Sequence, residues 1–136
     1  GNSSAAFCLL RLKEITGEEH YSSYAKTALT VGIEAVQRFP QGFGHLLQAI
    51  AFFITPTQQI VLSGQDTESF QQIINAAFHP HKVVLHLKDR PEYQARLVAA
   101  QQVSDNQTIA YLCEDFTCQE PVTDLDALQK RFSREQ

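Results

Sequence analysis

The segment Gln59-Ile60-Val61-Leu62-Ser63-Gly64-Gln65-Asp66 decides the fold, because the spacing of hydrophobic residues changes there. Its apolar run, Ile60 to Leu62, is short and continuous and ends in Ser63-Gly64, which is typical of a buried strand followed by a turn. Asp66 or Thr67 is then a suitable N-cap for a helix. The order of strand, turn and helix predicts an α/β unit. The apolar face expected for that helix consists of Phe70, Ile73, Ile74 and Ala77.

Two more strands are predicted downstream, at Lys82 to Leu87 and at Thr108 to Leu112, with a short helix from Glu92 to Ala100 between them. Continuous apolar runs separated by helices favour parallel strands that are buried on both faces. We therefore expect a small three-stranded parallel sheet with crossover helices. The last helix is expected to begin near Thr123, where Thr-x-x-Asp resembles a capping box that uses Asp126.

Upstream of this unit, the first 55 residues are predicted to be entirely helical. Apolar residues spaced three and four apart define a first helix ending at Gly17, which suits the left-handed conformation that follows many helices. The same spacing defines a second helix that stops before Pro40 and a third that is closed by Thr55-Pro56. The first two should form a hairpin. The expected apolar faces are Ala5, Cys8, Leu9 and Leu12 on the first helix, Tyr21, Tyr24, Ala25, Ala28, Ala35 and Val36 on the second, and Phe43, Leu46, Leu47 and Ile50 on the third.

The predicted fold class is thus α/β, with a helical segment at residues 1–56 and a small α/β module at residues 57–136. Neither part reaches the size at which a domain is comfortably stable alone. We therefore expect the two parts to share one core. Because the chain begins with glycine and contains no methionine, it is also expected to be a processed or excised piece of a larger protein.

The composition argues against several kinds of partner. The net charge is −4, and the Lys and Arg residues are scattered along the chain, so no basic stripe for nucleic acid or anionic lipid is expected. The longest apolar-leaning run, Leu46 to Ile54, is far shorter than the roughly 20 residues that cross a bilayer. Three cysteines are few and odd in number, which favours a reducing compartment and predicts a cytoplasmic location.

Cys113 and Cys118, which lie five positions apart between a strand and a helix start, are the candidate functional residues. They could be structural, as small apolar side chains at the end of a buried strand and in the following turn. They could be a thiol redox pair, although Glu114 and Asp115 beside them disfavour a thiolate. They could also bind a metal together with His79-x-His81, although one cysteine pair is weak evidence for such a site.

The sequence contains no complete active site. Ser63-Gly64 precedes a helix but lacks the spaced glycines of a nucleotide-binding loop. The carboxylate pairs Glu18-Glu19 and Glu114-Asp115 are adjacent in sequence and so point in different directions. His45 lies on an apolar helix and is expected to pack at the rim of the core. We therefore expect no catalysis by this segment alone, no cofactor and no metal.

One resemblance covers essentially the whole chain. The elements that carry it, in order, are Gly1-Asn2-Ser3 with Ala5, Leu9-Leu10-Arg11-Leu12, Thr16-Gly17, Pro40-x-Gly42-Phe43 with Leu46-Leu47, Gln59-Ile60-Val61 with Gly64, Lys82-Val83, Ala110-Tyr111-x-Cys113, Cys118, and Pro121-x-Thr123-Asp124. In this order they resemble the C-terminal region of the YyaL, or spermatogenesis-associated thioredoxin-domain-containing, protein family.

The resemblance implies a parent protein with an N-terminal thioredoxin-like domain and a central (α/α)6 toroid similar to six-hairpin glycosidases and epimerases. Residues 1–56 would end the toroid, and residues 57–136 would follow it. Such a parent would be carbohydrate-active or thiol-linked. The partners implied are the toroid helices and the thioredoxin-like domain of the parent. A homodimer through the exposed helical face, and sugar binding by exposed aromatics such as Tyr21, Tyr24 and Phe43, are alternative expectations.

Overall fold

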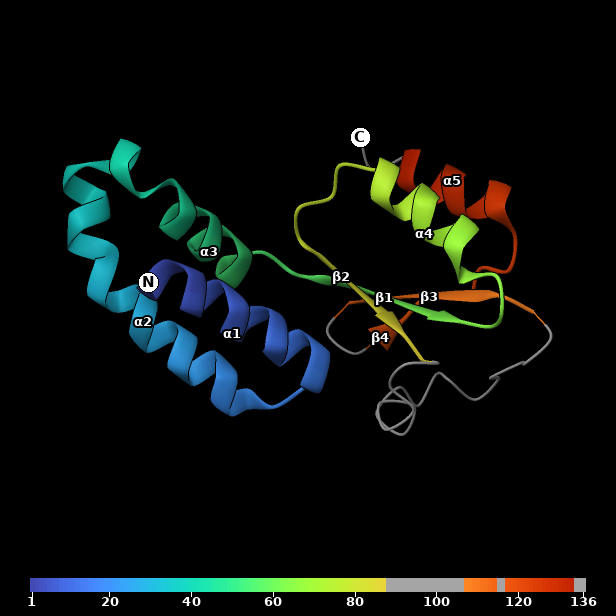
Figure 1. Ribbon diagram of the computed structural model, residues 1–136, viewed down its shortest axis with the longest axis horizontal. Helices are drawn as coiled ribbons and strands as arrows, with labels where there is room; N and C mark the ends of the chain where they lie inside the picture. Colours follow the sequence, from blue (N-terminus) through green and yellow to red (C-terminus); the bar gives the residue numbers. More distant parts are fainter. Residues whose placement is uncertain (88–106, 115–116, 134–136) are drawn as a thin grey trace. The chain divides into compact units, whose positions relative to one another are not determined.

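The computed structural model describes residues 1–87, 107–114 and 117–133. The chain divides into two compact units, a helical unit from Gly1 to Thr57 and an α/β unit from Gln58 to Gln136 (Figure 1). Helices followed by a small sheet confirm the predicted α/β class. Within the described ranges, no helix is both long and apolar enough to cross a membrane.

The helical unit consists of α1 (Asn2–Thr16), α2 (Glu19–Arg38), the short 3-10 helix η1 (Pro40–Phe43) and α3 (Gly44–Ile54). Helices α1 and α2 pack together as a hairpin, and α3 packs against both of them. The predicted hairpin and third helix are therefore confirmed. Helix α2 ends at Arg38. The next residue, Phe39, precedes Pro40, which disfavours helical backbone at that position.

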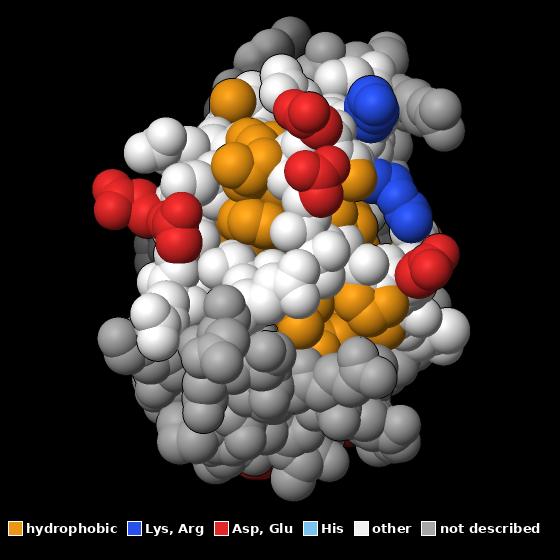
Figure 2. Space-filling model, turned by 90° about the vertical axis from the view of Figure 1, so that its right-hand side faces the viewer, with side chains coloured by type: hydrophobic (Ala, Val, Ile, Leu, Met, Phe, Trp, Pro, Cys, Tyr) orange, Lys and Arg blue, Asp and Glu red, His pale blue; other side chains and the backbone are white. Residues whose placement is uncertain are grey.

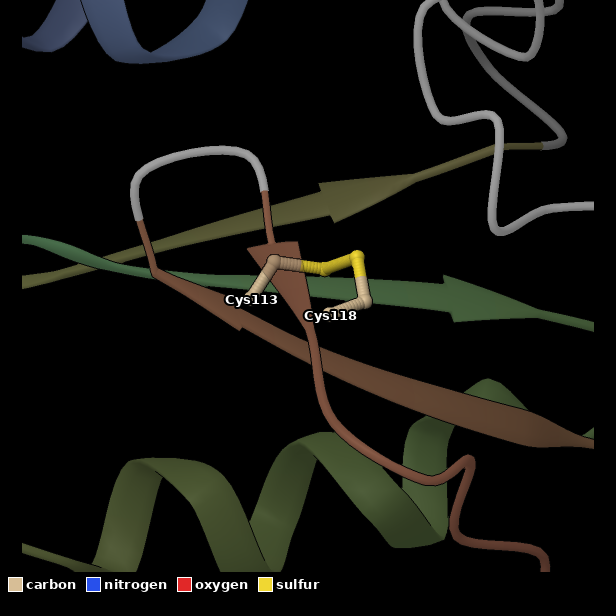
Figure 3. Close-up of a disulfide and its surroundings, with 2 residues drawn as sticks. All are labelled: Cys113 and Cys118. Atoms are coloured by element: carbon tan, nitrogen blue, oxygen red, sulfur yellow. A yellow bond between two sulfur atoms is a disulfide. The ribbon is translucent and has the colours of Figure 1, made fainter.

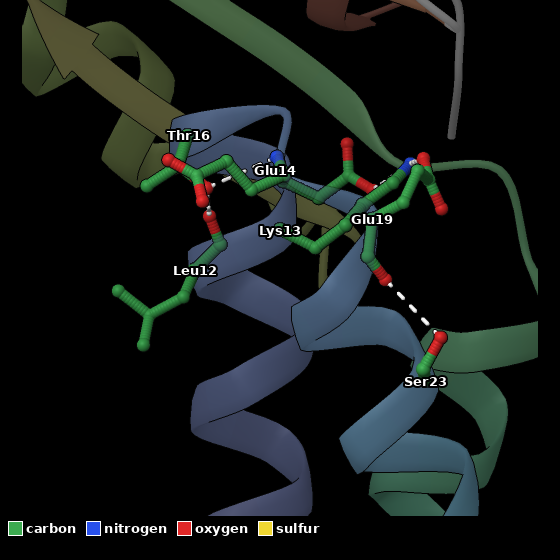
Figure 4. A network of polar contacts seen from close by, with 7 residues as sticks. Leu12, Lys13, Glu14, Thr16, Glu19 and Ser23 are labelled. Carbon is green, nitrogen blue, oxygen red and sulfur yellow. Dashed lines mark hydrogen bonds and ion pairs between the residues drawn. The ribbon is translucent and has the colours of Figure 1, made fainter.

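The turn between α1 and α2 is fixed by local hydrogen bonds and ion pairs (Figure 4). Gly17 has a φ of 70° and donates its N–H to the carbonyl of Lys13 at 2.7 Å, as predicted for a left-handed cap. The Thr16 hydroxyl donates to the carbonyl of Leu12 at 2.8 Å. The Lys13 ammonium lies 3.9 Å from a carboxylate oxygen of Glu19 in α2. These contacts fix the direction in which α2 leaves α1.

The prediction of which face α1 buries was wrong. Ala6 and Leu10 are the buried residues, whereas Cys8 is exposed and Leu12 is 38% exposed. Six consecutive apolar residues, 5–10, make the spacing compatible with more than one face. The face that is buried is set by the two helices that α1 contacts, which the spacing does not reveal. On α2 the prediction was partly correct, because Ala25 is buried but Tyr24 is 62% exposed.

Helices α2 and α3 approach each other closely at Gly32. A Cβ atom at this position would overlap the Leu46 side chain of α3. Leu46 is itself buried, with 3% of its surface exposed. A glycine in the middle of a helix costs conformational entropy, and here the close packing of Leu46 offsets part of that cost.

The α/β unit contains four strands, β1 (Gln58–Ser63), β2 (Lys82–His86), β3 (Ile109–Glu114) and β4 (Thr117–Cys118). They form one mixed sheet in the order β2-β1-β3-β4. Strands β1 and β2 are parallel and are connected through helix α4, which is the predicted strand, turn and helix arrangement. The other pairings, β1 with β3 and β3 with β4, are antiparallel.

The prediction of a three-stranded parallel sheet is therefore wrong in two respects. First, β3 pairs antiparallel with β1, from Gln58 opposite Glu114 to Ser63 opposite Ile109. A continuous apolar run indicates that a strand is buried on both faces, but it does not indicate the direction of the strand. Second, a fourth strand follows β3 in a segment that had been predicted as a turn. The predicted helix at residues 92–100 lies outside the described residues.

Helices α4 (Thr67–Ala76) and α5 (Leu125–Ser133) pack on the same face of the sheet (Figure 1). Asp66 is the N-cap of α4, as predicted, and its carboxylate accepts a hydrogen bond from the Ser69 hydroxyl at 3.1 Å. The core on this face consists of Ile60, Leu62, Phe70, Ile74, Ala110, Leu112, Val122, Leu128 and Phe132. This set includes side chains from β1, β3 and both helices, so it is the main core of the unit.

The predicted start of the last helix needs a correction. Helix α5 begins at Leu125, and the carboxylate of Asp124 accepts the N–H of Ala127 at 2.9 Å. Asp124 is therefore the N-cap, and the predicted capping box of Thr123 and Asp126 is wrong. Two acidic side chains and a threonine within four residues offer competing caps, and aspartate binds the free N–H groups at least as well as threonine does.

The opposite face of the sheet has a second buried cluster, made of Val61, Leu87, Ile109, Tyr111 and Cys113. The partly buried Leu85 and Cys118 pack against it. Successive strand residues point to opposite faces, so Val61 joins this cluster while its neighbours Ile60 and Leu62 join the other one. Both clusters contain residues of the α/β unit only. The prediction that the two units share one core stays a prediction.

Gly64 closes the turn between β1 and α4. Its φ is 112°, a conformation that residues with a side chain rarely adopt. A Cβ atom here would lie 2.6 Å from both the carbonyl oxygen of Gln107 and the Cα of Thr108. The turn is also tied to the start of β3, because the N–H of Asp66 donates to the Thr108 hydroxyl at 3.1 Å. This position therefore requires glycine.

Candidate functional site: a disulfide between adjacent strands

Cys113 at the end of β3 and Cys118 in β4 are joined by a disulfide (Figure 3). The two residues are directly opposite each other in the β3–β4 pair, and their Cα atoms are 3.9 Å apart. The bond lies on the face of the sheet that is opposite to α4 and α5, because both cysteines belong to the second cluster. It connects the last two strands of the sheet at its edge.

The spacing of five positions has a simple structural reason. Glu114 and Thr117 are paired, so only two residues, 115 and 116, connect β3 to β4. The N–H of Gln119 donates to the carbonyl of Leu112 at 2.9 Å. In an antiparallel pair, hydrogen-bonded and non-hydrogen-bonded residue pairs alternate, and the side chains of the latter are closer. Cys113 and Cys118 form the non-hydrogen-bonded pair between Glu114–Thr117 and Leu112–Gln119. Their side chains are therefore close enough for the sulfurs to bond.

The two sulfurs have different surroundings. Cys113 is 1% exposed, whereas Cys118 is only partly buried. Cys113 belongs to the apolar cluster with Tyr111, its neighbour on the same face of β3. Burial raises the pKa of the Tyr111 phenol, so this side chain stays neutral at physiological pH. The disulfide therefore has a buried apolar end and a more accessible end.

These observations bear on the three alternatives for the cysteine pair. The prediction that Cys118 lies in a turn was wrong, because it lies in β4. Burial of Cys113 at a strand end agrees with a structural role, and the bond itself agrees with either a structural or a redox role. For the metal alternative, no group of three His, Cys, Asp or Glu side chains suited to a metal ion occurs in the part of the chain that the structure describes. His79 and His81 therefore do not join the cysteines in such a group.

The other candidate residues are dispersed. Ser63 is the last residue of β1, and Gly64 begins the plain turn that leads into α4. His45 is on the exposed side of α3, with its ring 5.9 Å from that of Phe7. His20 is in the first turn of α2, with its Nδ1 3.2 Å from a carboxylate oxygen of Glu18.

The aromatic residues considered for sugar binding lie on different elements. Tyr21 and Tyr24 are on α2, and both rings lie near that of His20, with centroids 4.1 and 5.9 Å away. Phe43 is at the end of η1 and is partly buried. Of the three aromatic residues, only Tyr24 is exposed.

One functional-looking residue was missed in the sequence. The ammonium of Lys82, at the start of β2, donates to the carbonyls of Ala77, at 2.9 Å, and of Ile74, at the C-terminal end of α4. Burial lowers the pKa of Lys82. A cation at this end of a helix stabilises its unpaired carbonyls. The sequence signal for this contact is a lysine a few residues after a predicted helix. That pattern is too common to indicate such an interaction.

A shallow cavity of about 390 Å³ lies between α4 and α5. Its lining is neutral and consists of Gln72, Ile73, Ala76, Ala77, Gln129, Phe132 and Ser133. It is on the face of the sheet that lacks the disulfide. Figure 2 shows one face of the molecule, where hydrophobic side chains are gathered between acidic ones, and Lys and Arg side chains lie along one margin. The described residues on that face form no continuous basic stripe.

Comparison with known proteins gives related sequences but no related structure. No family model matches the chain, and no solved structure matches it. The chain is similar to human spermatogenesis-associated protein 20, with 28% identity over 137 residues, and to the proteins of the same name from rat and mouse, each with 28% identity over 138 residues. Each match covers 95% of this chain and 17% of the relative. The chain therefore spans about a sixth of the length of these relatives.

Proposed function

We propose that this chain is the C-terminal structural and interaction segment of a longer protein in the YyaL, or spermatogenesis-associated thioredoxin-domain-containing, family. In this proposal the segment is not catalytic by itself. The similarity to spermatogenesis-associated protein 20 supports this proposal, because it extends over 95% of the chain but only 17% of the relative. The activity of the parent, carbohydrate-active or thiol-linked, and its cytoplasmic location belong to the same proposal.

One observation carries the interaction role, namely the apolar surface that the helical unit leaves exposed. Val31 and Ile54 are each 72% exposed, and Phe39 is 67% exposed. A contiguous patch of exposed apolar side chains marks a surface that contacts another protein surface, and we infer that these side chains form such a patch. The complete set is Leu12, Tyr24, Val31, Ile33, Phe39, Leu47, Phe53 and Ile54. The proposed occupants are the neighbouring helices of an (α/α)6 toroid in the parent, and the thioredoxin-like domain is the other proposed partner.

The segment proposal is tested by finding the protein that contains this chain in its source cells. An antibody raised against the chain should detect a product several times heavier than 15.3 kDa on a denaturing gel. Peptides that cover the chain should be recovered from that band by mass spectrometry. A product of 15.3 kDa alone would contradict the proposal.

The interaction surface is tested by hydrogen exchange. In the longer protein, peptides that contain Val31 and Ile54 should exchange more slowly than in the isolated chain, because neighbouring helices cover them. Peptides of β1 should exchange equally in both. The isolated chain should also form a homodimer through this surface, and a Val31→Ser, Ile54→Ser variant should shift it to a monomer in sedimentation measurements. Equal exchange in both proteins would overturn this part of the proposal.

A second candidate function is a thiol–disulfide redox element made of Cys113 and Cys118. The disulfide at the sheet edge supports it, because a reducing compartment, which the cysteine count favours, would keep such a bond only transiently. Reaction of this pair with a thioredoxin-like domain of the parent is part of this candidate. Titration with dithiothreitol, followed by alkylation and mass spectrometry, measures whether the pair is reduced in the folded state.

The double variant Cys113→Ser, Cys118→Ser separates the two roles. If the bond is structural, its loss should lower the free energy of unfolding by about 2 kcal/mol, the value expected for closing so short a loop. If the pair is a redox element, the variant should keep its fold and lose electron exchange with dithiothreitol. The single variant Cys8→Ser is the control, because Cys8 is exposed and unpaired in α1.

A further inference from the structure

We propose that reduction of the disulfide has a fixed polarity, in which Cys118 is the sulfur attacked by an incoming thiolate and Cys113 is the sulfur released. This inference rests on the redox candidate and names the residue that its thiol partner modifies. The partner class is a protein dithiol, and the covalent intermediate is a mixed disulfide at Cys118. The basis is the difference in exposure between the two ends of one bond.

Access favours attack at Cys118. A thiolate must approach the attacked sulfur along the S–S axis, from the side opposite the leaving sulfur. Cys113 is 1% exposed and is packed in the cluster with Val61 and Tyr111, so approach to it is blocked. Cys118 is on the two-residue strand β4 and is partly exposed. Attack at Cys113 would require the cluster contacts around its side chain to open first.

The stability of the leaving thiolate favours the opposite polarity. Attack at Cys118 expels the buried Cys113 sulfur into apolar surroundings, whereas attack at Cys113 would expel the more exposed one. A poorer leaving group slows exchange but does not prevent it, since the rate depends only partly on leaving-group stability. Blocked access prevents the reaction until the structure opens, and opening here also breaks cluster contacts. Access therefore determines the polarity, and the buried leaving group makes the reaction slow.

Reduction of the cysteine pair takes two successive thiol–disulfide exchanges. The thiolate of a dithiol forms a bond to Sγ of Cys118 while the Sγ–Sγ bond breaks, and the electron pair goes to Sγ of Cys113, which takes a proton from water. The second thiol of the dithiol, after losing its proton, attacks its own partner sulfur in the mixed disulfide. Cys118 then leaves as a thiolate and is protonated. The dithiol is oxidised to a disulfide, and the cysteine pair is reduced to two thiols.

The first test maps the mixed disulfide directly. The full chain carrying Cys8→Ser is treated briefly with glutathione, quenched with acid and digested with pepsin at low pH, which prevents further exchange. We expect the glutathione adduct on Cys118 to exceed that on Cys113 by about tenfold or more. A longer incubation should not reverse the ratio. Equal adducts, or a larger amount on Cys113, would overturn the polarity.

The second test measures the access of each thiol and requires no intact disulfide. In the Cys8→Ser background, Cys113→Ser leaves Cys118 as the single thiol, and Cys118→Ser leaves Cys113. The aromatic disulfide reagent 5,5′-dithiobis(2-nitrobenzoate) should react at least about tenfold faster with Cys118 than with Cys113. In denaturant the two rates should become equal. Similar rates in the folded variants would contradict the inference.

The outcomes separate this inference from the redox candidate. If dithiothreitol does not reduce the folded protein at all, the redox candidate fails, and the polarity fails with it. If the pair is reduced and the adduct forms on Cys113, the redox candidate stands and the polarity alone is wrong. Circular dichroism of each variant before the assay shows whether it is folded, and the mapping experiment uses the native pair in any case.

Discussion

The helical unit and the α/β unit bury their apolar side chains to different extents. Most of the large apolar side chains that are exposed among the described residues belong to the helical unit, whereas Phe78 and Leu125 are those of the α/β unit. The sheet of the α/β unit has a buried cluster on each face. The three helices of the helical unit contact one another in pairs and still leave large apolar side chains such as Val31 and Ile54 exposed. The difference teaches that the α/β unit buries its large apolar side chains more completely than the helical unit does.

The largest effect expected from this comparison comes from removing a core side chain of the α/β unit. Leu128 is fully buried, so Leu128→Ala should lower the free energy of unfolding of this unit by about 2 to 5 kcal/mol. The matched change Val31→Ala in the helical unit should alter stability by less than about 0.5 kcal/mol. Hydrogen exchange of β1 and α2 peptides measures the two units separately. Similar effects of the two variants would contradict the comparison.

A smaller effect is expected at the turn that starts α4. Gly64→Ala should destabilise the α/β unit by about 1 to 3 kcal/mol, because the residue needs a positive φ and its Cβ would meet the backbone of residues 107 and 108. Gly42→Ala in the helical unit is the control, since nothing lies within 4 Å of its Cβ position. Urea unfolding followed by circular dichroism measures both. Equal tolerance of alanine would show that the turn does not need the described conformation.

The sequence predicts the elements better than it predicts their arrangement. The changes of hydrophobic spacing at Gln59, the cap at Asp66 and the stop at Gly17 are local signals, and the structure confirms each of them. Strand direction and the buried face of α1 depend on contacts between distant residues. The antiparallel pairing of β3 and the burial of Leu10 were missed for that reason.

For the site, the sequence identified both cysteines but not their geometry. The five-residue spacing fits a two-residue hairpin, yet Cys118 was predicted to lie in a turn because a strand of two residues leaves almost no pattern. The hydrogen bond from Gln119 to Leu112 joins the two strands, and no local pattern indicates it. The difference in burial between Cys113 and Cys118 depends on the strands and cluster residues that surround each of them in the sheet. It could not be inferred from the residues next to them in the sequence.

A loss of about 1 kcal/mol is expected when the cap of α5 is removed. Asp124→Ala removes the acceptor of the Ala127 N–H at the start of a helix that contributes Leu128 and Phe132 to the core. Thr123→Ala should have little effect, which distinguishes the observed cap from the one predicted in the sequence. Thermal unfolding measured by circular dichroism compares the two variants. A larger loss for Thr123→Ala would restore the predicted capping box.

The smallest effect concerns pH and distinguishes the α/β unit from the helical one. Burial lowers the pKa of Lys82, so the folded state binds the proton less tightly than the unfolded state does. Stability of the α/β unit should therefore rise with pH as it approaches 10.5, the ordinary pKa of lysine, and be lowest below the folded pKa. Lys82→Met should remove this rise.

Tyr111 provides the internal check on that measurement. Burial raises its pKa above the ordinary 10.0, so its contribution to stability is lost as pH rises from about 10 upward, opposite in sign to that of Lys82. Urea unfolding of the wild type and of Lys82→Met should therefore be compared between about pH 8 and 10. A rise of equal size in both proteins would show that Lys82 is not its source.

The disulfide also closes a covalent ring in the backbone that includes the hairpin turn. A protease that cuts between Cys113 and Cys118 would open this ring without separating the two pieces, because the sulfur bond still joins them. The nicked chain would migrate as one band without reductant and would release a short C-terminal peptide containing α5 with reductant. Whether the two pieces stay joined on a gel without reductant therefore shows whether the disulfide was present in the cleaved protein.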